Sequence, residues 1–150
     1  MKPKSTEIFQ VGILVRDVEQ TAKKLEDLVG IGPWEIMEPT YRDLTFHGKP
    51  GRFKIKLGLA MAGAVQIELV QLLEGETVYN DFIREQRYGL HHLGIRTDNM
   101  DESVRKFAEK GIRVTQSGNR PGTEWAYLDT KDETGIVFEL IEKNMFLKKK

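Results

Sequence analysis

Four polar side chains occupy matching places along the chain and could together hold a divalent cation. Gln10 and His92 open two short apolar segments, and Glu68 and Glu139 lie inside two others. A carboxylate in so apolar a surrounding is costly unless a cation or hydrogen-bond donors accompany it. Two carboxylates, one amide and one imidazole suit a hard-to-borderline divalent metal that keeps positions open for water or substrate.

An internal repeat relates these four residues to one another. Offset by 82 residues, the segment FQVGILVRDVEQTAKKL overlies HHLGIRTDNMDESVRKF, which aligns Gln10 with His92. The strand VQIELV around Glu68 likewise matches IVFELI around Glu139. Equivalent positions of a repeat should occupy equivalent places in the fold, so we expect two residues from each half to meet at one centre.

Each half is predicted to fold as one β-α-β-β-β module. Alternating apolar residues open each half as a strand, and Asp17 and Asn99 follow at the same offset as helix N-caps. Gly30 and Gly111 stand where these helices should end. Further strands are expected over residues 34–46, 52–60, 112–116 and 124–128.

The sequence therefore predicts one α+β domain over residues 1–150. Module one covers about residues 7–72, a linker helix about 77–86 and module two about 90–142, and a basic C-terminal tail follows. In each module the helix must cover the apolar face of the strands. The four polar residues then share the opposite, concave face.

Each of these residues also has a purely structural interpretation. A Glu in an apolar strand can lie on an exposed face or in an ion pair, and a lone His is often a hydrogen-bonded interior residue. Gln10 is the weakest ligand, because a neutral amide binds metals poorly. His91 is the alternative to His92, but the repeat aligns His91 with Phe9. His47, beside a predicted turn, is expected to be a loop residue.

Possible contacts to a substrate are less specific than the four polar residues. Arg96 is the best single candidate for binding an anion, because strand parity places it beside His92. Three further cations share one face of a strand that either lines the cavity or faces solvent: Arg52, Lys54 and Lys56. Three aromatic residues could line the cavity or simply pack in the core: Trp34, Trp125 and Tyr127.

Composition excludes several kinds of site. The 23 Lys and Arg balance the 23 Asp and Glu, so the chain lacks the net basic field of a nucleic-acid binder. There is no cysteine, which excludes disulfides, thiol nucleophiles and Cys-ligated metals. No apolar run approaches the roughly 20 residues of a membrane span, and the start lacks a signal-peptide core. We expect a cytoplasmic protein without membrane or nucleic-acid partners.

The paired modules, with Q-V-G-I and H-L-G-I openings and E-L-V and E-L-I closings, resemble the vicinal oxygen chelate superfamily. That superfamily includes glyoxalase I, methylmalonyl-CoA epimerase, extradiol dioxygenases and antibiotic-resistance binding proteins. The likeness covers roughly residues 7–142, and LVGIGPW and GLHHLGIRTDNMD look most like the epimerase branch. It implies a glyoxalase-like fold with a divalent metal (Zn, Ni, Co or Mn) on Gln10, Glu68, His92 and Glu139.

The chain also departs from these relatives in ways that bear on the reaction. The epimerase usually has His in place of Gln10 and a second acid/base Glu in a hairpin, where this chain has HGKPGRF. No carboxylate lies between Asp43 and Glu68. A Gln-Glu-His-Glu set is instead similar to that of zinc-type glyoxalase I. Extradiol dioxygenases use two His and one Glu, which disfavours that activity.

The resemblance implies an isomerase, epimerase or lyase that removes a proton next to a carbonyl and forms an enediolate. Glu139 would be the base, and Glu68 could exchange a proton on the opposite side. The expected substrate is an acyl-CoA, as for methylmalonyl-CoA epimerase, or a glutathione hemithioacetal, as for lactoylglutathione lyase. The alternative is a non-catalytic binding protein for a drug or metabolite. A homodimer is expected by analogy.

Overall fold

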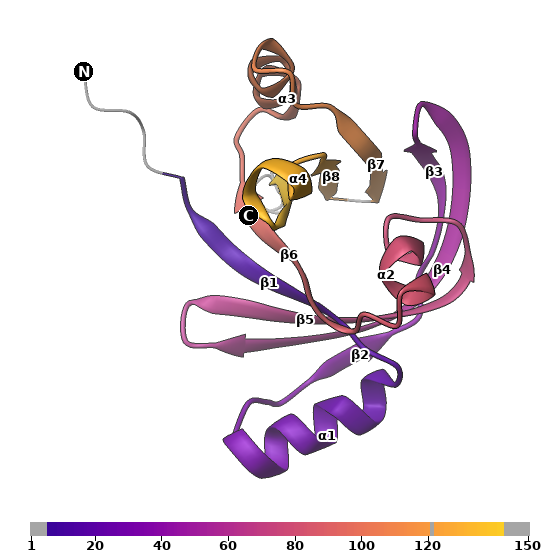
Figure 1. The fold of residues 1–150 in the computed structure, drawn as a ribbon. Coiled ribbons are helices and arrows are strands. Elements are labelled where there is room, and N and C mark those ends of the chain that lie inside the picture. The colour runs from indigo at the N-terminus through magenta and orange to yellow at the C-terminus, as the bar shows by residue number, and fades with distance from the viewer. Residues whose placement is uncertain (1–5, 121, 143–150) are drawn as a thin grey trace.

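The computed structural model describes residues 6–120 and 122–142, and within these it forms one strongly curved sheet with helices outside it (Figure 1). The strand order is β2-β4-β3-β7-β8-β9-β6-β1-β5, and β4 pairs with β5 as well, so the sheet closes on itself. Its strands are β1 (Ile8–Leu14), β2 (Glu35–Met37), β3 (Thr40–Phe46), β4 (Lys49–Ala62), β5 (Val65–Gly75), β6 (Gly89–Arg96), β7 (Val114–Arg120), β8 (Thr123–Leu128) and β9 (Val137–Glu142).

The helices begin and end near the predicted signals. In α1 (Val18–Val29) the Asp17 side chain accepts from the Gln20 amide at 2.9 Å, and Gly30 ends the helix in the left-handed region with φ 71°. In α3 (Met100–Glu109) Asn99 caps the Glu102 amide at 3.0 Å. Two short helices, α2 (Asn80–Arg84) and α4 (Lys131–Thr134), complete the described elements.

The repeat predicted from the sequence is visible in the strand pairing. β1 runs parallel to β5 in the first half, and β6 runs parallel to β9 in the second. The halves join twice through antiparallel pairs, β1 with β6 and β3 with β7. These two seams close the sheet around an interior to which both halves contribute.

Two predicted elements differ from the structure, and one observed helix was not predicted. The strand expected over residues 34–46 is divided into β2 and β3, because Pro39 lacks an amide proton and its carbonyl instead accepts from Ile55. The helix expected over 77–86 is only the short α2, and α4 was not predicted. The predicted basic tail lies outside the described residues.

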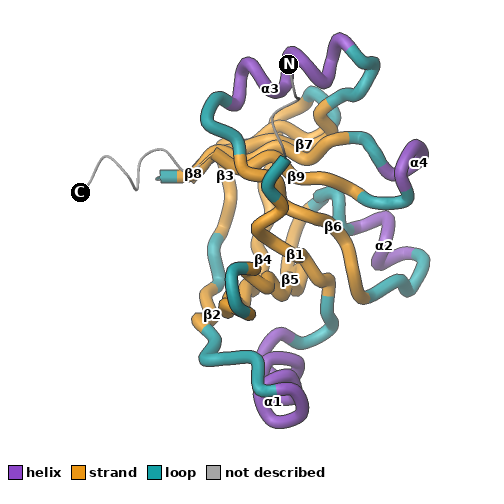
Figure 2. Tube along the Cα trace, turned by 90° about the vertical axis from the view of Figure 1, so that its left-hand side faces the viewer, coloured by secondary structure: helices purple, strands orange, loops and turns teal. Residues whose placement is uncertain are grey.

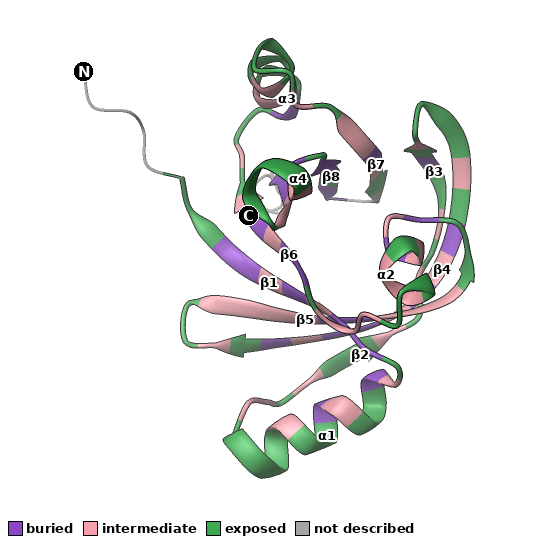
Figure 3. Cartoon of the chain, viewed as in Figure 1, coloured by how far each residue is buried: buried purple, intermediate pink, exposed green. Residues whose placement is uncertain are grey.

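Apolar packing on the outer faces holds α1 and α3 against the sheet. Val15, Val18, Ala22 and Leu69 form a buried cluster under α1, and a second cluster lies under α3, made of Met100, Ala126, Leu128 and Leu140. α1 and α3 lie at opposite ends of the molecule, with the sheet between them (Figure 2). Figure 3 shows the buried stretches of the strands in purple.

None of the helices in the described residues is both long and apolar enough to cross a membrane.

Candidate metal centre

Four adjacent strands bring the four predicted residues together. Gln10 lies on β1, Glu68 on β5, His92 on β6 and Glu139 on β9, and these strands follow one another in the sheet. In the pairing register, Gly12 lies between Glu68 and His92, while Gly94 lies between Gln10 and Glu139. The two glycines, themselves equivalent in the repeat, leave the space in which the four larger side chains meet.

Three oxygen atoms surround the Nε2 atom of His92. It lies 3.2 Å from Gln10 Oε1, 3.3 Å from Glu68 Oε1 and 3.0 Å from Glu139 Oε2. His92 is fully buried, and Gln10 and Glu139 are nearly so. One ligand atom from each of Glu68, His92 and Glu139 lies within 4.8 Å of the others.

The four side chains are better arranged to bind a divalent cation than to form hydrogen bonds with one another. A single N–H on His92 cannot serve three oxygen acceptors well, whereas a cation can be shared by the nitrogen and all three oxygens. For metal–ligand bonds of about 2.1 Å, neighbouring ligand atoms of a tetrahedral or octahedral site lie about 3.0–3.4 Å apart. The distances around His92 fall in this range, so small adjustments would admit an ion.

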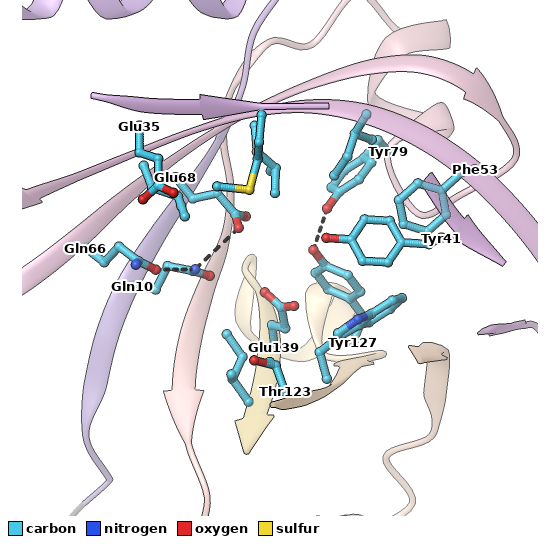
Figure 4. A pocket seen from close by; sticks show the side chains of 16 residues that line it. Gln10, Glu35, Tyr41, Phe53, Gln66, Glu68, Tyr79, Thr123, Tyr127 and Glu139 are labelled. Carbon is cyan, nitrogen blue, oxygen red and sulfur yellow. Dashed lines mark hydrogen bonds between the residues drawn. The ribbon is translucent and has the colours of Figure 1, made fainter. Parts of the chain in front are cut away.

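Two further residues orient the candidate ligands. Gln10 Nε2 donates to Gln66 Oε1 at 2.8 Å and to Glu68 Oε2 at 3.4 Å, which turns the Gln10 amide oxygen toward His92 (Figure 4). The Nδ1 atoms of His91 and His92 are 3.1 Å apart. With the donor proton on His92 Nδ1, its Nε2 faces the three oxygens, which is the arrangement that a metal-binding imidazole needs.

The two neighbouring histidines have opposite electrostatic environments. Burial and the adjacent His92 lower the pKa of His91 to about 3, so His91 is neutral and can accept the proton of His92 Nδ1. Burial alone would lower the pKa of His92 as well, but Glu139 and Glu68 favour its charged form and raise its pKa to about 10. Without metal, His92 is therefore a cation between two carboxylates.

These pKa values predict a stability maximum near pH 6.5 for metal-free protein. Below pH 6.5 the unfolded chain protonates His91 and the folded chain does not, so the free energy of unfolding falls as pH falls. Above pH 6.5 the folded chain keeps the His92 proton that the unfolded chain loses, so stability falls again toward pH 10. Thermal unfolding from about pH 4.5 to about pH 9.5 should show both slopes. His91→Asn should flatten the acid slope alone, and an unchanged acid slope in that variant would refute this origin.

The absence of a side chain at Gly12 sets the position of His92. A Cβ at Gly12 would overlap the His92 imidazole, so Gly12→Ala should lower the free energy of unfolding by about 1–3 kcal/mol through overpacking. Urea unfolding of Gly12→Ala, His92→Ala and the double variant measures the coupling between the two sites. The penalty at Gly12 should largely vanish in the His92→Ala background. If it persists there, the imidazole is not what constrains Gly12.

The candidate centre opens into a cavity of about 450 Å³. Figure 4 shows Glu68 and Glu139 on one side of it and a group of aromatic rings on the other. Five polar lining residues were not predicted from the sequence: Glu35, Tyr41, Gln66, Tyr79 and Thr123. Gln66 shares strand parity with Glu68 and could have been found in that way. Glu35 could not, because it reaches the cavity through the β2–β4–β5 register, which aligns Glu35 with Leu59 and Leu59 with Glu68.

Arg96 is not brought to the centre. The guanidinium of Arg96 lies 4.7 Å from the centre of the Phe9 ring. Arg96 is exposed and is not one of the residues that line the cavity. The cations of β4 also face away, because Phe53, Ile55 and Leu57 take the inward positions. Arg52 and Lys56 pair instead with exposed carboxylates, at 3.7 Å from Glu74 and 2.9 Å from Glu19 respectively.

The other residues singled out in the sequence lie as follows. Trp125 and Tyr127 line the cavity, whereas Trp34 packs against the cluster under α1. His47 lies in the turn between β3 and β4 with φ 49°, as expected of a loop residue. His91 is buried behind His92 and does not line this cavity.

Comparison with known families and structures gives a consistent result. Residues 9–128 match the model of the Glyoxalase/Bleomycin resistance protein/Dioxygenase superfamily. Among solved structures, methylmalonyl-CoA epimerase from Mycobacterium tuberculosis is 20% identical, with a TM-score of 0.68 and coverage of 95% of this chain and 91% of that chain. A variant of the Streptomyces coelicolor epimerase, in complex with 2-nitronate-propionyl-CoA, is 19% identical with a TM-score of 0.69, covering 94% of this chain and 96% of that one.

Two uncharacterised proteins are also similar. The hypothetical protein BH1468 from Bacillus halodurans is 21% identical with a TM-score of 0.67, over 94% of this chain and 96% of that chain. The uncharacterized protein YqjC of Bacillus subtilis is 22% identical over 92 residues. That match spans 59% of this chain and 66% of YqjC. At these identities the structural likeness defines the fold alone.

Proposed function

Because this chain belongs to the glyoxalase/bleomycin resistance protein/dioxygenase superfamily, we propose that it is a divalent-metal-dependent enzyme that removes a proton next to a carbonyl. The observation that carries the proposal is the convergence of Gln10, Glu68, Glu139 and His92 beside an open cavity. Members of the superfamily typically bind a divalent metal, and this donor set is suited to Zn, Ni, Co or Mn.

In such a reaction, different residues would bind the metal, orient its ligands and exclude water. A bound divalent cation would act as a Lewis acid toward two neighbouring substrate oxygens and so stabilise an enediolate. Gln66 and His91 hold Gln10 and His92 in the orientation that binding requires. The closed sheet keeps these groups largely out of water, which strengthens every electrostatic interaction with the substrate.

Glu139 is the proposed base. Its carboxylate takes the proton from a hydroxyl-bearing carbon next to the carbonyl; the electrons of the broken C–H bond form a C=C bond, and the π electrons of the carbonyl move onto its oxygen. An isomerisation is completed when the proton returns to the former carbonyl carbon and the hydroxyl of the first carbon gives its proton to the other oxygen, so that the first carbon becomes the new carbonyl. A carboxylate that binds a cation is a weak base, so Glu139 must loosen from the centre when it accepts the proton.

Epimerisation would need a second group on the other face of the carbon. Glu68 is one candidate for this group, because its Oε1 lies 3.3 Å from the same His92 Nε2 atom that Glu139 approaches at 3.0 Å. Glu35 is a further carboxylate in the cavity lining, near Glu68 in the strand register, and its residue is exposed. Glu35 could serve as the second acid/base carboxylate. The hairpin between β3 and β4 cannot provide one, since residues 44–67 contain no Asp or Glu.

The experiment that tests the proposal is deuterium exchange with and without metal. Chelator-treated protein is loaded with Zn, Ni, Co or Mn in D₂O, and methylmalonyl-CoA and the methylglyoxal–glutathione hemithioacetal are assayed by NMR or mass spectrometry. Metal-dependent deuterium incorporation in either compound supports the proposal and identifies its type. If the protein binds less than about a tenth of an equivalent of each of the four metals, the result would refute a metal enzyme and favour a binding protein.

A further inference from the structure

We infer that the cavity selects an uncharged substrate that carries a ring, with its two neighbouring oxygens toward Glu68, His92 and Glu139 and its ring against the aromatic wall. This inference deepens the proposed function and relies on it for the place of the two oxygens. The preference for an uncharged ring rests on separate features of the cavity, its charge and its aromatic wall.

The charges of the cavity disfavour an anion. Its lining includes three carboxylates, Glu35, Glu68 and Glu139, and among the described residues that line it there is no Lys or Arg. With neutral His92 and a divalent cation in place, three negative charges meet two positive ones, which leaves one net negative charge. A carboxylate or phosphate that lies against the wall, away from the centre, finds no Lys or Arg in this lining and is repelled by the net negative charge.

The wall opposite the centre is made of packed aromatic rings: Tyr41, Phe53, Tyr79, Trp125 and Tyr127. Tyr41 stacks on Phe53 at 4.9 Å between ring centres and meets Trp125 edge-on at 5.8 Å. Trp125 in turn lies 5.9 Å from Tyr127. Rings that hold one another in this way form a surface ready to accept a further ring without rearrangement.

Two hydroxyl groups lie between the wall and the centre. Tyr79 Oη and Tyr127 Oη are 2.6 Å apart and both point into the cavity (Figure 4). Their mutual hydrogen bond uses one of the two protons. The other can be donated to an oxygen of an uncharged ligand.

The size of the cavity is consistent with this class of ligand. A volume of about 450 Å³ lies in the range of roughly 300–1,000 Å³ that is typical of small-molecule sites. It accommodates a six-membered ring with a short oxygen-bearing chain. The phosphates of a CoA group or the carboxylates of glutathione would have to remain outside this lining.

Three small ligands separate the effect of a charge on binding from the effect of a ring. 2-Hydroxy-1-phenylethanone (2-hydroxyacetophenone) has a ring and two neighbouring oxygens without charge, 4-(hydroxyacetyl)benzoate has the same features with a carboxylate on the far side of the ring, and hydroxyacetone lacks the ring. Titration calorimetry of each against metal-free and Co²⁺-loaded protein gives six dissociation constants. We expect 2-hydroxyacetophenone to bind at least tenfold more tightly than either other probe to the Co²⁺-loaded protein. Its advantage over hydroxyacetone should remain in metal-free protein.

Variants locate the bound ring. Trp125→Leu should weaken 2-hydroxyacetophenone at least tenfold and hydroxyacetone little, whereas the matched control Trp34→Leu, outside the cavity, should change neither. Tyr127→Phe keeps the ring and removes the hydroxyl, and should weaken 2-hydroxyacetophenone by about three- to tenfold. Because Trp125 is buried, circular dichroism checks the fold, and Phe53→Leu gives a second test of the wall.

The outcomes distinguish this inference from the proposed function. Equal or tighter binding of 4-(hydroxyacetyl)benzoate or hydroxyacetone to the Co²⁺-loaded protein would overturn the uncharged-ring inference, even where metal increases the affinity. A ring preference that is the same with and without Co²⁺, together with no metal binding, would support the aromatic wall and refute the metal centre.

Discussion

Glu139→Gln is expected to slow proton exchange next to the carbonyl by about 10²–10⁴-fold, the usual contribution of a positioned general base. Glutamine keeps the size of the side chain but cannot accept a proton. Glu139 lies 3.0 Å from His92 Nε2 and lines the cavity, so no displacement of the chain is needed to bring it to a substrate. Deuterium incorporation by the metal-loaded variant is the measurement.

Two controls make this result specific. Glu74→Gln removes an exposed carboxylate of β5 that pairs only loosely with Arg52, and it should leave exchange unchanged. Metal content must be measured in parallel, because Glu139→Gln also removes a charged ligand. A variant that exchanges at more than about a third of the original rate while fully loaded would show that Glu139 is not the base.

Metal binding is expected to release about one proton per ion at about pH 7.5. In metal-free protein the carboxylates Glu139 and Glu68 raise the pKa of His92 to about 10, so the imidazole carries two protons at this pH. A metal ligand must be a neutral imidazole, and one proton therefore leaves when the ion binds. Metal affinity should rise by about tenfold per pH unit until the pH approaches about 10.

Calorimetric titration of Zn²⁺ or Co²⁺ in two buffers with different ionisation enthalpies counts these protons. His92→Gln should bind the ion at least about a hundredfold more weakly and release no proton from this position. Ion binding with no proton released to the buffer would contradict a doubly protonated His92 that becomes a ligand of the ion.

The four central residues could be predicted because two independent patterns agreed on them. Strand parity indicated the inward face, and the repeat aligned Gln10 with His92 and Glu68 with Glu139. The structure brings all four together. These side chains can meet because Gly12 and Gly94 have no side chains of their own. In the sequence, the two glycines stood out only as part of the repeat.

The rest of the site depends on long-range pairing that no local pattern reveals. Glu35 reaches the cavity because β2 pairs with β4, and β4 with β5. Tyr79 falls in a stretch expected to be a linker helix, yet its side chain is buried against Tyr127. Arg96 shares strand parity with His92, but the curved strand β6 carries it out of the cavity and over Phe9.

Anomalous scattering from crystals grown with Co²⁺ would test the metal centre most directly. We expect one strong peak per chain at the cobalt edge, at about 2.0–2.2 Å from His92 Nε2 and from oxygens of Glu68 and Glu139, with the Gln10 amide oxygen completing the set. A peak elsewhere, or none at saturating Co²⁺, would contradict a metal centre formed by these four residues.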